Sequence, residues 1–121
     1  MSSRRVVAVV PNLFFAARIA ETAAQLGVEL ETVAPPGVAA AVGARPTDLV
    51  VLDLGAAGDP VATARALKSA AATRDIPIVG FYPHVEGALR EAALAAGVDH
   101  VLPRSAFTAR LASLLAGDDL R

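Results

Sequence analysis

The sequence predicts an α/β fold in which helices cover both faces of a parallel β-sheet. Five short apolar segments alternate with longer segments of helical periodicity, and this unit recurs roughly every 20–25 residues. The length of 121 residues suits one domain and leaves little room for a second. We therefore expect a single domain over residues 1–121, with its core at about 4–116 and a polar tail at 117–121.

The five expected strands differ in how continuously apolar they are. The runs VVAVV at 6–10 and LVVLDL at 49–54 are typical of strands buried on both faces. The segment VELETV at 28–33 alternates apolar and polar residues, which is typical of an edge strand. The remaining strands are IPIVGF at 76–81 and VDHVL at 98–102. With the continuous runs in the centre, the strand order is 2-1-3-4-5, a flavodoxin-like three-layer α/β/α sandwich with five helices.

Capping residues mark the expected helix ends. Asn12 and Ser105 are candidate N-caps, Asp59 precedes a proline suited to a first helical turn, and Gly27 is a candidate C-terminal residue. In the first helix, Phe14 and Phe15 are expected to provide core and near-surface packing. The five expected helices cover about 13–26, 35–44, 60–72, 84–96 and 105–115.

Composition excludes several classes of function. The net charge of −1 gives no support for a nucleic-acid-binding surface, and the absence of cysteine excludes disulfides and thiolate chemistry. No apolar run reaches the roughly 18–20 residues of a membrane-spanning helix. The opening MSSRR lacks the apolar region of a signal peptide. We therefore expect a cytoplasmic protein that binds neither nucleic acid nor membrane.

Four segments together resemble the receiver domain of two-component response regulators. They are DLVVLDL at 48–54, the following loop GAAGDP, the strand IPIV, and AGVDHVLPRSAF at 96–107, so the resemblance covers nearly the whole chain. It implies that Asp53, near the end of the third strand, matches the phosphoacceptor aspartate of receivers. In this fold the carboxyl end of that strand borders the ligand-binding crevice.

The other functional positions of receivers carry different residues here. The acidic pair that helps to hold magnesium falls on Val10-Pro11 or on Pro11-Asn12, and neither register supplies a carboxylate. The threonine or serine after the fourth strand falls on Tyr82, and the lysine after the fifth strand falls on Arg104. The resemblance therefore implies a dismantled phosphorylation site, with magnesium binding lost or very weak and no other cofactor.

These substitutions suggest another role for Asp53. Asp53 is then an unphosphorylated carboxylate held by backbone N–H groups, by Tyr82 or by Arg104, and the ring of Tyr82 is expected to fill or cover the crevice. Pairing with Arg104 is favoured, because its planar guanidinium is able to bond Asp53 directly. In that case Asp53→Asn costs about 1–3 kcal/mol of stability, because Arg104 loses its partner.

The predicted function is that of a degenerate receiver, or pseudo-receiver: a non-enzymatic protein-interaction module of bacterial signalling. Two alternatives remain open, namely a working receiver phosphorylated on Asp53 and a binder of small anionic ligands in the vacated crevice. The expected partner is a signalling protein or a second copy of the chain. By resemblance, a homodimer would use the face of the fourth helix, fifth strand and fifth helix, with candidate residues Leu89, Arg90, Ala93, His100, Arg110 and Leu114. The segment FYPH at 81–84 is either a stiff loop or part of a contact surface.

Overall fold

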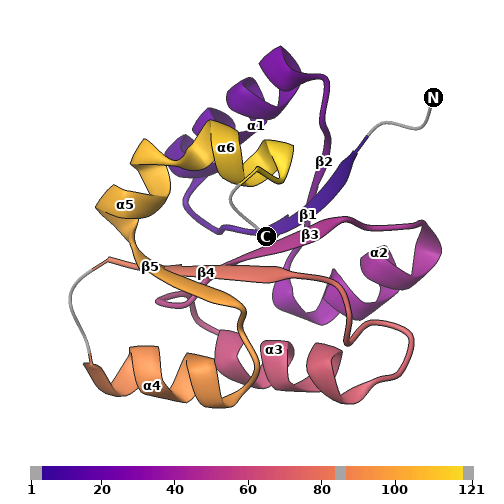
Figure 1. The fold of residues 1–121 in the computed structure, drawn as a ribbon, viewed down its shortest axis with the longest axis vertical. Coiled ribbons are helices and arrows are strands. Elements are labelled where there is room, and N and C mark those ends of the chain that lie inside the picture. Colours follow the sequence, from indigo (N-terminus) through magenta and orange to yellow (C-terminus); the bar gives the residue numbers. More distant parts are fainter. Residues whose placement is uncertain (1–3, 84–86, 119–121) are drawn as a thin grey trace.

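The computed structural model describes residues 4–83 and 87–118. Its centre is one five-stranded parallel sheet with the order β2-β1-β3-β4-β5, which confirms the predicted topology (Figure 1). The two continuously apolar strands lie inside the sheet, and the alternating strand lies at one edge. The strands are β1 (Arg5–Val9), β2 (Glu29–Thr32), β3 (Leu49–Asp53), β4 (Ile78–Tyr82) and β5 (His100–Pro103).

Helices cover both faces of the sheet and enclose two apolar clusters (Figure 1). One cluster joins the sheet to α1 (Leu13–Leu26), α5 (Arg104–Ala109) and α6 (Leu111–Ala116). The other cluster lies on the opposite face, beneath α2 (Val38–Ala44), α3 (Pro60–Ser69) and α4 (Gly87–Ala95). Within the described ranges, no helix is both long and apolar enough to cross a bilayer. A 3-10 turn, η1 (Pro35–Gly37), comes directly before α2.

Most helix ends are where their capping residues predict them. The Asn12 side chain accepts a hydrogen bond from the backbone N–H of Phe15 at 2.9 Å and starts α1. Gly27 ends that helix with a left-handed φ of 70°. The Asp59 side chain accepts from the N–H of Ala62 at 3.1 Å, directly before α3. These three predictions are confirmed.

The C-terminal helix differs from its prediction. Ser105 is not an N-cap, because the extended Pro103 precedes a helix that already begins at Arg104. The single helix expected at 105–115 is divided into α5 and α6 at Arg110, whose φ of −106° and ψ of 9° interrupt the helical geometry. The structure therefore has two short helices where the sequence predicts one.

A buried arginine ties the edge strand to the rest of the molecule. The Arg5 side chain is only 3% exposed and donates to the Ala41 carbonyl at 3.1 Å and to the Thr47 hydroxyl at 2.6 Å. It also forms ion pairs with Glu31 at 2.5 Å and with Glu29 at 3.4 Å. Because these partners lie on β2, on α2 and just after α2, one guanidinium connects all three segments to β1.

The AGVD segment at 96–99 has a structural role at the amino ends of β4 and β5. The Asp99 carboxylate forms a 2.8 Å ion pair with Lys68 and accepts from the N–H of Ile78 at 2.8 Å. Gly97 has a φ of +101°, and a Cβ added there would lie 2.7 Å from Cγ of Lys68. The segment therefore connects α3 to the sheet and requires glycine at this position.

Candidate functional site

Asp53 lies at the carboxyl end of β3, near the point where the strand order reverses. It is in register with Phe81 of β4, while the preceding Leu52 is in register with Val9 of β1. The side chain is half-buried, and its Oδ1 accepts a hydrogen bond from the N–H of Gly55 at 3.0 Å. Asp53 is therefore held by its own loop at the crevice that the strand order defines.

The residues beside Asp53 at the end of β1 do not complete a magnesium site. Val10 follows Val9 and is buried, so the register places an apolar side chain at the level of Asp53. Pro11 is exposed, and the side-chain oxygen of Asn12 already caps α1. In the described part of the chain, no cluster of three or more acidic or histidine residues could hold a metal ion. This donor set does not fit Mg²⁺, which prefers several oxygen ligands with carboxylates among them.

Arg104 contacts an aromatic ring and forms no ion pair with Asp53. Its guanidinium carbon lies 4.3 Å from the ring centroid of Phe15. Among the described residues, none of the salt bridges includes Asp53 or Arg104. The direct ion pair expected from the sequence is therefore wrong. The reason is that α5 begins at Arg104 itself, beside α1, where the face of an aromatic ring attracts a cation.

Burial has the largest effect on the pKa of the Asp53 carboxyl group. Burial raises the pKa of the Asp53 carboxyl above its ordinary value of 3.8. The Gly55 N–H and the positive charge of Arg104 both lower this pKa, but by less than burial raises it. The folded state therefore disfavours the carboxylate relative to the unfolded chain.

This pKa reverses the expected effect of removing the charge. Because the pKa of Asp53 is raised on folding, its ionisation destabilises the protein, and the penalty grows as pH rises through the folded pKa. We expect Asp53→Asn to melt at a higher temperature than the unsubstituted protein at pH 7, and the difference to shrink below pH about 4. Thermal unfolding followed by circular dichroism at both pH values measures this.

Asp99→Asn is the matched control, because it removes a carboxylate that has an ion-pair partner and a backbone donor. It should lower the melting temperature at pH 7. A lower melting temperature in Asp53→Asn at that pH would contradict the burial argument.

The loop after β4 covers part of the crevice, but Tyr82 does not. Tyr82 is buried among the apolar residues beneath α2, α3 and α4, which corrects its expected place over the crevice. The alternation of side chains along β4 turns its ring toward that face. Pro83 instead contacts the loop after β3: a Cβ added to Gly55 would lie 3.0 Å from Cδ of Pro83. His84, the last residue of the FYPH segment, lies outside the described residues.

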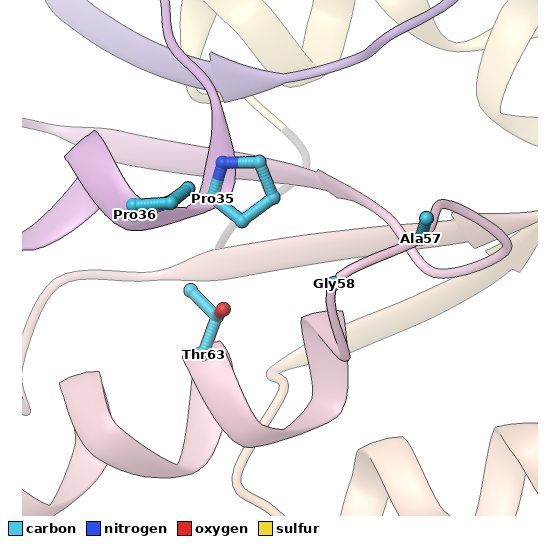
Figure 2. A pocket seen from close by; sticks show the side chains of 5 residues that line it. All are labelled: Pro35, Pro36, Ala57, Gly58 and Thr63. Atoms are coloured by element: carbon cyan, nitrogen blue, oxygen red, sulfur yellow. The ribbon is translucent and has the colours of Figure 1, made fainter.

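A hollow of about 450 Å³ borders the loop that follows Asp53 (Figure 2). Figure 2 shows η1 on one side of the hollow, with Thr63 of α3 and the β3–α3 loop opposite. No charged side chain lines it, so it offers no cation to a small anionic ligand. The lining residues are Pro35, Pro36, Ala57, Gly58 and Thr63.

The six residues proposed for a dimer face do not share one surface. Ala93 and Leu114 are 0% exposed and belong to the clusters on opposite faces of the sheet, so neither is available to a partner. Leu89 packs against the cluster that contains Ala93. Arg90 is exposed, whereas the other two residues, His100 and Arg110, are partly buried. The proposed set is therefore wrong at Ala93 and Leu114, whose side chains point into the core.

An exposed apolar pair was underestimated from the sequence. Leu13 and Phe14, at the start of α1, are 82% and 89% exposed. The sequence pattern indicates this exposure, because the buried residues of α1, namely Phe15, Ile19 and Ala23, recur at intervals of four. Phe14 lies outside that pattern, so only Phe15 belongs to the core.

Comparison with known structures identifies the class of fold. No family model and no curated protein matches the sequence. Solved structures of response regulator receiver domains, however, share the fold over nearly the whole chain.

Three of them illustrate the likeness. The chemotaxis response regulator CheY4 of Vibrio cholerae has a TM-score of 0.82 at 17% identity, with 95% of this chain and 98% of that chain covered. A response regulator from Hahella chejuensis has a TM-score of 0.81 at 25% identity, with 95% and 94% covered. The receiver domain of the sensor histidine kinase PA1611 of Pseudomonas aeruginosa, described with magnesium coordinated in its active-site cleft, has a TM-score of 0.78 at 17% identity, with 95% and 99% covered.

Proposed function

We propose that this chain is a degenerate receiver: a cytoplasmic, non-enzymatic protein-interaction module of two-component-type signalling that is not switched by magnesium-dependent phosphorylation of Asp53. The observation that carries the proposal is the isolation of Asp53. Its neighbours at the end of β1 are an apolar residue, a proline and an amide engaged in capping α1. The receiver fold is retained while the charges that would serve phosphoryl transfer are absent from these positions.

Phosphoryl transfer to a carboxylate depends on charge stabilisation. Metal ions and cationic side chains neutralise the oxygens of the transferring group and hold it in line with the attacking oxygen. Here the nearby cation, Arg104, is stacked on Phe15, and the raised pKa of Asp53 reflects a carboxylate that burial disfavours. Pro83 also packs against Gly55, the residue whose N–H binds the Asp53 carboxylate. Each of these features argues against a role of Asp53 in accepting a phosphoryl group.

A phosphodonor experiment tests the proposal directly. The protein is incubated with a small-molecule acyl phosphate and excess Mg²⁺ at neutral pH and then analysed by intact mass spectrometry. We expect no phosphorylated species, because the site lacks the charges that stabilise the transferring group. The cyanobacterial phytochrome response regulator RcpA, whose phosphorylated form has been solved, serves as the positive control for the donor.

The Asp53→Asn variant assigns any modification that does occur. A phosphoryl adduct on the unsubstituted protein that disappears in Asp53→Asn would overturn the proposal and establish a working receiver. An adduct that persists at the same level in the variant would lie on another residue and would not be a modification of Asp53.

A further inference from the structure

We propose that a second copy of this chain docks on the amino end of α1, where the exposed Phe14 of each copy enters an apolar hollow of the other and Leu13 packs at the rim of that hollow. This surface differs from the face of the fourth helix, fifth strand and fifth helix. The inference concerns oligomerisation and holds whether or not Asp53 accepts a phosphoryl group.

The pair Leu13–Phe14 forms a fixed apolar projection. Both side chains are more than four-fifths exposed, although they are large and adjacent. The backbone beneath them is held by the Asn12 cap, and the next residue, Phe15, is buried against Phe81 and Phe107. Because the backbone is already ordered, docking has to order only the two side chains and costs little further backbone entropy.

An uncharged hollow of about 320 Å³ lies directly beside this projection. Leu13 forms part of its wall, so the projection and the hollow share one edge. Two further wall residues, Val10 and Pro11, occupy positions where the resemblance to receivers would place carboxylates. Their apolar character makes the hollow suitable for an aromatic side chain. The full lining is Val10, Pro11, Leu13, Thr32, Val33, Ala34 and Pro35.

A projection beside a matching hollow is self-complementary under two-fold symmetry. In such an interface, the projection of one copy fills the hollow of the other, and the reverse contact follows automatically. Two phenylalanine side chains and the walls that they cover account for roughly 600–1,000 Å² of buried area. The two leucines add to this area and bring it to about 1,000 Å², the lower limit for a specific interface. No charge in the hollow opposes the contact, and the net charge of −1 per chain gives little repulsion between copies.

Sedimentation velocity over a concentration series tests the proposal. We expect a reversible monomer–dimer equilibrium in the unsubstituted protein and dissociation that is at least about 30-fold easier in Phe14→Glu, as for an interface residue that dominates binding. Phe14 is 89% exposed, so the substitution does not disturb the core. Circular dichroism and thermal unfolding of the variant verify that it is folded.

Leu94→Glu is the matched control, because Leu94 is an exposed leucine on α4, away from this surface. It should dimerise like the unsubstituted protein. A protein that remains monomeric at several hundred micromolar would overturn the proposal, as would a dimer that survives Phe14→Glu. Growth beyond a dimer, into larger species that depend on Phe14, would overturn the two-fold arrangement, because a closed two-fold contact ends at two copies.

Discussion

Replacing Phe107 by alanine is expected to lower the free energy of unfolding by about 3–5 kcal/mol, the usual range for a buried phenylalanine. Phe107 is fully buried and stacks on Phe81 with ring centroids 4.6 Å apart, and its ring lies 5.9 Å from that of Phe15. The substitution removes both aromatic contacts and leaves a cavity between α1, α5 and the sheet. Urea unfolding followed by circular dichroism measures the change.

The cavity would also lie close to the crevice, because Phe107 packs against Phe15 and Phe81. Phe15 carries the guanidinium of Arg104, and Phe81 is in register with Asp53. Leu94→Ala, on a side chain that is 42% exposed, should cost less than about 1 kcal/mol and serves as the control. Equal losses in the two variants would show that the aromatic cluster does not dominate this side of the core.

Replacing Arg5 by alanine is expected to cost about 2–4 kcal/mol. The guanidinium is buried, and its loss removes a donor from Glu31 and from the Ala41 carbonyl and leaves Glu29 paired with Arg45 alone. Breaking a buried ion pair usually costs about 3–5 kcal/mol. Both glutamates remain partly exposed and regain water, which lowers the expected cost. Urea unfolding measures this change also, and Arg5→Met, which keeps the apolar stem, separates lost packing from lost charge.

Arg45 provides a matched comparison, because it also pairs with Glu29 but is 60% exposed. Arg45→Ala should cost no more than about 1 kcal/mol, since exposed ion pairs contribute little. If Arg45→Ala were as damaging as Arg5→Ala, burial would not be the reason for the importance of Arg5.

The fate of individual charged residues shows how far sequence reasoning reaches at this site. Asp53 was placed correctly, because β3 lies at the switch point of this strand order, where the carboxyl ends of the strands border the crevice. The partner of Arg104 was predicted wrongly, because Phe15 approaches Arg104 only through the packing of α1 against α5. Arg5 gave no signal at all: in the opening MSSRR it reads as a surface charge, yet it is buried by β2 and α2.

By itself, the sequence determined the class of fold, the strand order and most helix ends. These depend on local information: apolar periodicity, the alternation in the edge strand, and caps such as Asn12 and Asp59. The tertiary structure decided which side chains meet. It placed Arg104 on Phe15, Tyr82 on the far face of the sheet, and Leu13 and Phe14 in solvent beside an apolar hollow. Such contacts depend on how each helix is rotated and positioned on the sheet, and packing over the whole core fixes that rotation.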